Sequence, residues 1–386
     1  MSWSTVRADQ FCTLITDGTH DSPKPQQSGW KLITSKHLKG HYIDFDSANW
    51  ISEADYLKVI SRSAVEQWDI LFSMIGTIGN IYLEKNPHVE YACKNMGIFK
   101  FSGNKENALW MYYYLKSPQA KAYIQTHLRG STQAYVPLGG LREMPVPVPP
   151  QSVRNEIIAV LRPIDEKIEC NNAINDNLQQ QAAALFSSLY DRSNTEVRFT
   201  DLIQILGGGT PKTGENTYWN GNIAFFTPKD VGIPYTLITE KTISKEGLSH
   251  CNSRLYPVNT VFVTARGTVG KVGMSGVPMA MNQSCYALVG KETHQLLVYF
   301  YTLKAVDRLK HKASGAVFDA ITTRDFESEQ IMKLSDDDAT AFLRVAEPMF
   351  QEVLNNNIEN LRLSTLRDSL LPKLMSGEID VSAVQL

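Results

Sequence analysis

Two long stretches of the chain carry apolar residues three or four positions apart, the pattern of one buried helix face. In the first, over about residues 153–190, the apolar positions are 157, 161, 164, 168, 178, 182, 185 and 189. The second, over about 338–375, repeats the first at a constant offset of 185 residues without gaps. The spacing predicts two long helices that pair through a coiled-coil seam.

The predicted pairing makes the helices antiparallel, because two similar apolar stripes in one chain bury each other most simply that way. This arrangement puts the rest of each half at opposite ends, related by a pseudo-twofold axis. The predicted helix–helix interface consists of Ile157, Leu161, Ile164, Ile168, Leu178, Leu185, Leu189, Phe342, Met349, Val353, Leu363, Leu370 and Leu374.

Polar residues and a proline interrupt the first stripe. Asn171 and Asn175 stand on the seam, where a buried asparagine can set the register of paired helices at some cost in stability. We expect Asn171 and its counterpart Asn356 in the second stripe to form hydrogen bonds between the helices. Pro163 lacks a backbone N–H and is expected to kink the helix or to mark the start of a new one.

The two larger segments also repeat each other, less regularly. Gly76–Ile81 recurs as Gly267–Val272 at an offset of 191, and Thr34–Leu38 corresponds to Thr227–Val231 at 193. Short β-rich runs at 69–75 and 260–264 are separated by turn residues, and an aromatic helix is expected near 107–127 and near 293–312. Residues 144–150, with four prolines, predict a stiff extended connector.

The sequence therefore predicts an α+β protein with an internal repeat: two mixed α/β domains, separated and bridged by two long antiparallel coiled-coil helices. The predicted segments are a first domain at 1–150, a first helical spacer at 151–192, a second domain at 193–335, and a second helical spacer with the C-terminal tail at 336–386.

The composition predicts a soluble, cytoplasmic protein whose cysteines are reduced thiols. The chain is 43% hydrophobic and 20% charged, and its five cysteines are scattered without a C-x-x-C pair. This usage argues against a disulfide framework and against a metal site. The net charge is −2, but residues 1–150 carry 15 basic and 13 acidic residues, and residues 193–335 carry 15 and 12. The small positive excess lies where a polyanion could bind.

Several motifs, taken together with the internal repeat, resemble those of the specificity subunits of type I restriction–modification systems. The resemblance covers essentially the whole chain. The residues that carry it are Ile15–Pro23, Gly208–Thr213, Tyr218–Gly221, Thr227–Asp230, Ala265–Gly270, Pro145–Pro150 and Leu370–Ile379.

The resemblance implies a non-catalytic subunit with two target-recognition domains, each reading one half of a bipartite, asymmetric double-stranded DNA site. The helices would set the gap between the half-sites; about 35 helical residues span roughly 50 Å. The implied partners are two modification (methyltransferase) subunits and ATP-dependent restriction subunits. S-adenosylmethionine, ATP and Mg²⁺ would bind to those partners, and this chain would hold no cofactor or metal.

Reading bases requires side chains with paired hydrogen-bonding groups, and holding phosphates requires Lys, Arg, Ser or Thr. Candidates of these types lie in polar loops beside the predicted strands. In the first half they are Lys31, Ser35, Lys36, Thr77, Asn80, Lys94, Asn95, Arg129, Ser131, Thr132 and Gln133. In the second half they are Lys212, Thr213, Tyr218, Lys229, Arg266, Thr268, Lys271, Asn282, Gln283, Lys312, Ser314 and Arg324.

Each of these residues has an alternative interpretation as a solvated loop residue. Arg266 is the preferred candidate because it precedes a Gly-Thr-Val-Gly turn, while the matching position in the first half is Ile75. This difference favours a role in sequence reading over a shared phosphate contact. The tyrosines at 112–114 and the aromatic residues at 299–301 could stack on bases, but helical spacing favours the core.

Catalytic motifs are absent from the sequence. There is no P-loop, H-E-x-x-H or G-x-S-x-G motif, and no Asp/Asn-Pro-Pro-aromatic run of an adenine methyltransferase. The alternative from another class is a protein-interaction scaffold with duplicated domains that does not read DNA, which would suit the near-neutral charge.

Overall fold

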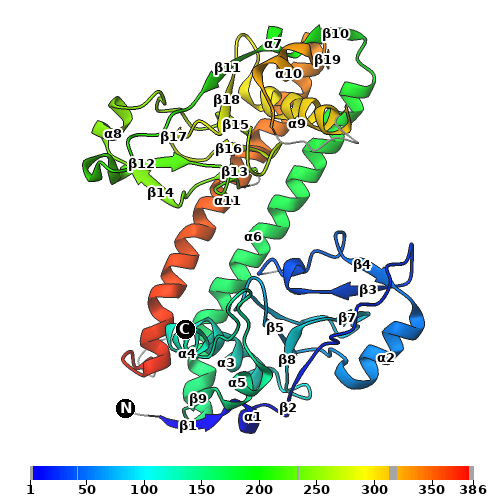
Figure 1. The fold of residues 1–386 in the computed structure, drawn as a ribbon, viewed down its shortest axis with the longest axis vertical. Helices are drawn as coiled ribbons and strands as arrows, with labels where there is room; N and C mark the ends of the chain where they lie inside the picture. The colour runs from blue at the N-terminus through cyan, green and yellow to red at the C-terminus, as the bar shows by residue number, and fades with distance from the viewer. Residues whose placement is uncertain (1–2, 41, 233, 313–319, 382–386) are drawn as a thin grey trace. The chain divides into compact units, whose positions relative to one another are not determined.

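The computed structural model describes residues 3–40, 42–232, 234–312 and 320–381. Its contacts divide the chain into two compact units, each with its own core (Figure 1). Unit 1 consists of Met1–Glu169 and Arg362–Leu386, and unit 2 of Cys170–Leu361. The helices α6 (Gln151–Asp191) and α11 (Asp336–Ser376) contribute residues to both units. Within the described part of the chain, no helix combines the length and apolar content needed to cross a membrane.

Unit 1 contains a four-stranded sheet of order β2-β8-β5-β6, a three-stranded sheet of order β4-β3-β7, and the pair β1-β9. Its elements are β1 (Ser4–Arg7), α1 (Ala8–Phe11), β2 (Leu14–Asp17), β3 (Trp30–Ile33), η1 (Ser35–His37), β4 (Asn49–Ile51), α2 (Glu53–Ser63), β5 (Ile70–Ser73), β6 (Ile81–Leu83), β7 (Tyr91–Cys93), β8 (Met96–Lys100), α3 (Lys105–Lys116), α4 (Pro118–Thr126), α5 (Leu138–Glu143) and β9 (Pro145–Val148).

Unit 2 contains a five-stranded sheet of order β11-β18-β15-β16-β13, a three-stranded sheet of order β14-β12-β17, and the pair β10-β19. Its elements are β10 (Thr195–Arg198), α7 (Phe199–Leu202), β11 (Ile203–Gly207), η2 (Asn216–Tyr218), β12 (Trp219–Phe226), β13 (Tyr235–Thr236), β14 (Lys241–Ile243), α8 (Lys245–Ser249), β15 (Val261–Thr264), β16 (Val272–Ser275), β17 (Met279–Met281), β18 (Cys285–Gly290), α9 (Gln295–Lys312), α10 (Thr323–Ser328) and β19 (Gln330–Lys333).

The two units repeat the same topology, which confirms the internal repeat. The order β2-β8-β5-β6 corresponds strand by strand to β11-β18-β15-β16, and β13 is an addition in unit 2. In the smaller sheets, the central strand pairs in parallel with β7 in one unit and with β17 in the other. The short runs expected at 69–75 and 260–264 form β5 and β15, buried along their whole length.

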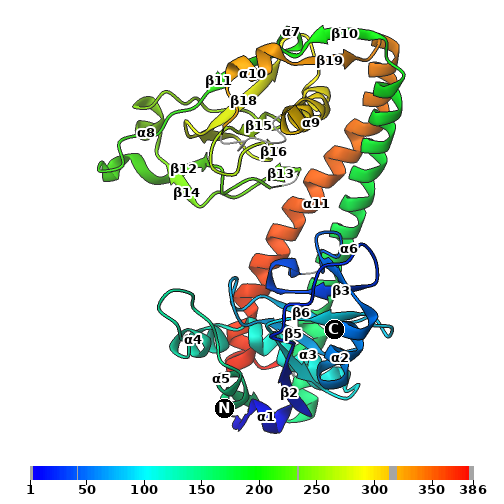
Figure 2. The ribbon, with the colours of Figure 1, turned by 45° about the vertical axis from the view of Figure 1, so that its right-hand side comes forward.

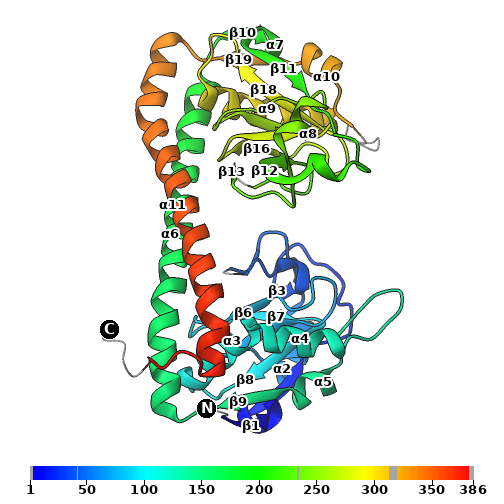
Figure 3. The same ribbon diagram turned by 90° about the vertical axis from the view of Figure 1, so that its left-hand side faces the viewer.

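The proline-rich segment at 144–150 is extended, as predicted, and its residues Pro145–Val148 form the paired strand β9, a pairing that the sequence did not indicate. β9 pairs antiparallel with β1, with Val146 opposite Val6. Proline is tolerated in β9 because β9 is an edge strand: on the side away from β1, its backbone needs no N–H to bond to a further strand. β10 and β19 form the same ribbon in unit 2, next to the end of α6 and the start of α11 respectively (Figure 3).

The helix expected at 107–127 is two helices, and this prediction also needs correction. Ser117 has an extended backbone (φ −68°, ψ 153°), and its side chain accepts a hydrogen bond from Ala120 N, with Pro118 at the first helical position of α4. A serine cap followed by proline starts a helix and cannot continue the preceding one. In unit 2 the corresponding element is the single helix α9, which lies against the larger sheet (Figure 2).

The aromatic runs at 112–114 and 299–301 belong to the core, as helical spacing indicated. Tyr112, Tyr113 and Tyr114 are all buried, and so are their counterparts in α9. Tyr301 uses its hydroxyl oxygen at 2.9 Å to accept a hydrogen bond from Leu334 N. These rings therefore fill the space between sheet and helix and are closed to stacking on bases.

Both long helices are continuous over 41 residues, with Pro163 inside α6. No new helix starts at this proline. Ile157 and Leu161 of α6 join Leu374 of α11 in the core of unit 1. In unit 2, the later part of α6 and the earlier part of α11 lie in one apolar cluster with α9. Each core therefore combines a sheet with two helix segments distant in sequence.

Every residue of the predicted helix–helix interface is at least half-buried. The buried ones are Ile157, Leu161, Leu189, Phe342, Val353 and Leu374, and the half-buried ones are Ile164, Ile168, Leu178, Leu185, Met349, Leu363 and Leu370. Part of this burial comes from the sheets and from α3 and α9. The apolar stripe thus serves the domain cores as well as the helix pair.

Within unit 2, asparagines join α6 to α11, as expected for Asn171 and Asn356. Asn175 Nδ2 donates to Asn357 Oδ1 at 2.9 Å, and Asn356 Nδ2 donates to Asn175 Oδ1 at 2.9 Å. Asn171 Nδ2 donates to Asn360 Oδ1 at 2.9 Å. Lower residue numbers in α6 pair with higher residue numbers in α11, so the two segments are antiparallel. Amides buried in this way fix register because any slip leaves them unpaired.

Within unit 1, a buried carboxylate joins the helices to α3. Asp165 lies 2.7 Å from Arg367 and 3.2 Å from Lys116, and its side chain is 10% exposed. Burial would raise the pKa of Asp165, but Lys116 and then Arg367 outweigh it, and the pKa lies below its usual value. Burial lowers the pKa of Lys116 and exceeds the opposing effect of Asp165.

Replacing Asp165 by alanine should destabilise the chain by about 3 kcal/mol, because two half-buried cations lose their common partner, although Arg367 keeps its contact with Asp368. Urea unfolding followed by circular dichroism measures this. The control is Asp176→Ala, which removes an exposed carboxylate of the same helix and should change stability by less than about 0.5 kcal/mol. Equal effects of both changes would contradict a structural role for Asp165.

Candidate nucleic-acid interface

Each unit contains a hollow at a corresponding place. Hollow 1, of about 380 Å³, is lined by Thr34, Ser35, Lys36, Ile75, Gly76, Thr77, Lys94, Asn95 and Gln133. Hollow 2, of about 500 Å³, is lined by Thr227, Pro228, Lys229, Glu240, Lys241, Arg266, Gly267, Thr268, Asn282 and Ser284. In both, the walls are the loop after the central strand of the smaller sheet, the hairpin turn after β5 or β15, and the loop before β8 or β18.

The first wall is a loop closed by a threonine. In unit 1, Thr34 N donates to His37 Nδ1 at 2.9 Å. In unit 2, Thr227 N and Oγ1 donate to Asp230 Oδ2 at 2.8 and 2.6 Å. An imidazole and a carboxylate thus close the same turn, because both offer an acceptor to a backbone N–H. Lys36 and Lys229 lie inside these loops and are exposed.

The second wall is the Gly-Thr-x-Gly turn. Gly76 and Gly79 have φ of +78° and +90°, and Gly267 and Gly270 have φ of +84° and +74°. Residues with side chains adopt such φ at a cost, so the glycines serve turn geometry, as the sequence indicated.

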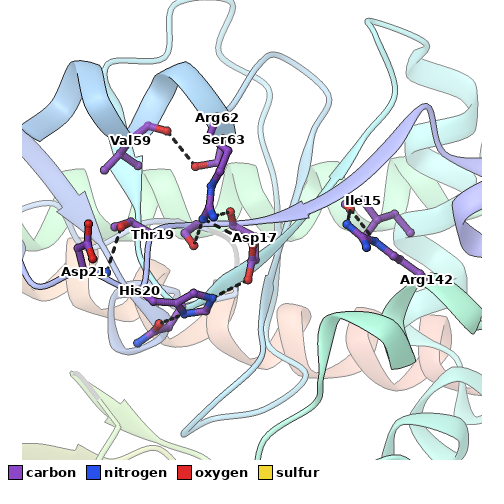
Figure 4. Close-up of polar contacts among 11 residues, drawn as sticks. Ile15, Asp17, Thr19, His20, Asp21, Val59, Arg62, Ser63 and Arg142 are labelled. Carbon is purple, nitrogen blue, oxygen red and sulfur yellow. Dashed lines mark hydrogen bonds and ion pairs between the residues drawn. The ribbon is translucent and has the colours of Figure 1, made fainter.

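In unit 1, His20 of the loop after β2 contacts the third wall, and two arginines hold β2 and the start of this loop (Figure 4). The ring nitrogens of His20 lie 2.8 Å from Asn95 Oδ1 and 2.8 Å from Asp17 Oδ2. Arg62 donates to Gly18 O at 3.0 Å, and Arg142 donates to Ile15 O at 2.9 Å. The side-chain oxygen of Asn95 is therefore engaged, and its amide nitrogen has no hydrogen-bond partner within the described part of unit 1.

Ten of the predicted DNA-binding residues line the hollows. Hollow 1 collects Ser35, Lys36, Thr77, Lys94, Asn95 and Gln133. Hollow 2 collects Lys229, Arg266, Thr268 and Asn282. These residues come from loops far apart in sequence. Such sets of cations, hydroxyls and amides can bind phosphates and base edges.

Other predicted residues lie outside the hollows. Arg129, Ser131 and Thr132 are exposed in the loop that carries Gln133, and Asn80 lies on another depression of unit 1. Lys212, Thr213, Lys271, Gln283 and Arg324 are exposed, and Tyr218 stacks on His250. Ser314 lies outside the described residues.

Two of the predicted lysines outside the hollows, Lys31 and Lys312, are engaged within their own unit, and in hollow 1 Lys94 donates a hydrogen bond to the hydroxyl of Ser22. Lys31 Nζ donates to Ala48 O at 2.9 Å and lies 3.9 Å from the centre of the Trp50 ring. Lys312 pairs with the carboxylate of Glu329, a fully buried residue. Both cations therefore stabilise the fold before any ligand binds.

Sequence reasoning missed several residues of this interface. Lys241 and Ser284 line hollow 2, and His20 and Arg62 support hollow 1. Their places depend on which loops meet in the fold. The Thr-x-Lys pattern of the repeat could have drawn attention to Thr34 and Thr227, which stand at equivalent positions. Among the described residues, no group of three or more His, Cys, Asp or Glu side chains could hold a metal.

His37 should make the stability of unit 1 depend on pH. Burial first, and then repulsion by Lys36, lower the pKa of His37 below the usual 6.5, and the neutral ring is the form that accepts from Thr34 N. This contribution is fully present above the unfolded pKa of about 6.5 and is lost as the pH falls through the folded pKa.

Urea midpoints measured from pH 7.5 to pH 5 should therefore fall for the wild type. His37→Asn keeps an acceptor without titrating, so it should show a smaller fall. Identical pH profiles for both proteins would refute the assignment.

Comparisons with known proteins agree on one family. A family model described as the type I restriction modification DNA specificity domain matches residues 3–180 and again 192–333. The chain is similar to the type I restriction enzyme HindI specificity subunit of Haemophilus influenzae, with 22% identity over 415 residues, 85% of this chain and 90% of that protein.

A second relative matches about half of the chain, and a solved structure matches nearly all of it. The EcoR124I/EcoR124II specificity subunit of Escherichia coli is 26% identical over 211 residues, which is 51% of each protein. A solved structure of the S subunit of a type I restriction-modification system from M. genitalium has a TM-score of 0.56 at 15% identity, covering 97% of this chain and 96% of that one. At this identity, the structural similarity shows the shared fold alone.

Proposed function

The chain belongs to the type I restriction modification DNA specificity domain family, and we propose that it selects the DNA target of a type I restriction–modification enzyme. Unit 1 reads one half of a bipartite, asymmetric site in double-stranded DNA, and unit 2 reads the other half.

The observation that carries this proposal is the pair of hollows on equivalent loops. Hollow 1 offers Lys36 and Lys94 without an acidic residue in its lining. Hollow 2 offers three cations against one carboxylate, and that carboxylate, Glu240, lies 3.7 Å from Lys229. Local positive charge on a chain of net charge −2 suits a polyanion. Differences between the linings suit two different half-sites.

The long helices fit a role as spacer and docking surface. Their register is fixed by the asparagines of unit 2 and by Asp165 in unit 1. In the proposed complex, the helices set the gap between half-sites and bind two modification subunits, which restriction subunits join.

The chain contributes recognition and no catalysis. In this proposal S-adenosylmethionine belongs to the modification subunits, and ATP with Mg²⁺ to the restriction subunits. The sequence motifs of a P-loop and of an adenine methyltransferase are absent from this chain.

Exchanging residues 193–335 for the corresponding domain of another family member should change one half of the recognised site. The full chain, assembled with its modification subunits, is expressed in cells, and methylated adenines are mapped by sequencing. The half-site read by residues 1–150 stays the same. A motif that changes in both halves, or in neither, contradicts the modular assignment.

DNA binding by the full chain should weaken steeply with salt, because phosphate contacts release counterions. With six or more phosphate contacts, affinity falls on the order of 10³-fold between 50 and 200 mM salt. A mobility-shift series with a duplex that carries the methylated motif measures this. A flat salt response would favour the protein-interaction scaffold.

A further inference from the structure

Positions 75 and 266 carry side chains of opposite character on matching backbone. Ile75 forms an isolated antiparallel bridge with Tyr135, and Arg266 forms one with Ala320. Each residue directly precedes the Gly-Thr turn and lines the hollow of its unit. Because the backbone is the same at both positions, the change from isoleucine to arginine alters which chemical groups each hollow can bind.

The side chain of Arg266 is free for a ligand. Its backbone is anchored, since Ala265 N and Arg266 N donate to Ser284 O at 2.8 and 3.3 Å. The residue is exposed, and no acceptor within the described ranges contacts its guanidinium. Arg62 and Arg142, by comparison, donate to backbone carbonyls. An arginine that served only to stabilise unit 2 would be paired in this way.

The chemistry of the guanidinium points to guanine. Its two parallel N–H groups match the O6 and N7 acceptors that guanine presents in the major groove. Thr268 Oγ1 already donates to Pro228 O at 3.1 Å, and Asn282 Oδ1 accepts from Ser284 N at 3.0 Å. These two neighbours are held by the fold, whereas the guanidinium of Arg266 has no acceptor among the residues that the structure describes.

Hollow 1 offers different groups at the same place. Ile75 can contact the methyl group of thymine, and the exposed amide of Gln133 can pair with N6 and N7 of adenine. The Ser35 hydroxyl, also on this lining, has no hydrogen-bond partner in the part of the chain that the structure describes. The lining therefore suits an A·T pair.

We propose that positions 75 and 266 determine specificity: Arg266 selects a G·C pair in the half-site of unit 2, and Ile75 with Gln133 selects an A·T pair at the corresponding place in the half-site of unit 1. This inference rests on the proposed function.

The test is the methylation motif of the full complex with Arg266→Ala. One guanine in one half-site should relax to any base, while the other half-site stays unchanged. Ile75→Ala should relax an A·T position in the opposite half-site only. A bipartite wild-type motif that both variants leave unchanged, or one without a guanine in the half-site of unit 2, would overturn the inference and leave the proposed function standing. A wild type without any bipartite motif would instead refute the proposed function.

Loss of methylation in a variant is resolved by binding measurements on the full chain. Wild type should prefer the duplex with the guanine over single-base substitutions by roughly 5- to 150-fold, and Arg266→Ala should bring this ratio close to one. The matched control is Arg254→Ala, which removes an exposed arginine of unit 2 outside the lining of hollow 2 and outside the predicted DNA-binding set, and which should leave the ratio unchanged.

A phosphate contact would give a different result. In that case Arg266→Ala weakens binding to all duplexes equally and lowers the salt slope by about one, and the inference is wrong. Thermal unfolding of each variant shows whether it is folded. If Arg266→Ala unfolds, Arg266→Gln is measured in its place, because its amide keeps a long polar side chain but matches N6 and N7 of adenine and not the two acceptors of guanine.

Discussion

The structure depends on the burial of apolar helix faces in cores that the sheets cannot close alone. Unit 1 is complete only when Leu371 and Leu374, near the end of the chain, join Ile157 and Leu161 beside α3. Unit 2 has the same requirement for the opposite segments of the two helices. A helix with one apolar face is unstable in water, and a small sheet with one uncovered face is too. Each therefore stabilises the other.

Apolar burial alone does not determine the register of the two helices. The polar contacts between them do. Leucine and isoleucine can pack in several alignments at similar free energy, whereas a buried amide or carboxylate loses its partner after a shift of one residue. Asn175 makes such contacts in unit 2, and Asp165 makes them in unit 1. The register of each helix segment then determines where α3 or α9, and the strands behind it, can pack.

The two interfaces illustrate how one frame carries two specificities. Backbone geometry is conserved between the units: the threonine-closed loop, the turn with left-handed glycines, and the parallel strand pair that brings the third wall alongside. Side chains that face the hollows differ, above all Ile75 and Arg266. Because the frame is held by backbone hydrogen bonds and glycine conformations, side chains on its surface can change without unfolding the unit.

The sequence by itself determined the repeat, the two long helices, the buried strands β5 and β15, and the aromatic cores of α3 and α9. These follow from local periodicity, which side-chain burial enforces residue by residue. Local pattern was misleading at Ser117, where a capping hydroxyl outweighs helical periodicity. At Pro145–Val148 it predicted the extended backbone but not the pairing with β1.

Only the tertiary structure decided which candidate residues meet. Lys36, Thr77, Asn95 and Gln133 share one hollow although almost 100 residues separate the first from the last, whereas Lys31 and Lys312 are held by partners in their own units. A polar loop residue looks the same in sequence whether it lines a binding surface or pairs with a buried carboxylate. The difference lies in long-range contacts, which depend on strand order and helix register and leave no periodic trace along the chain.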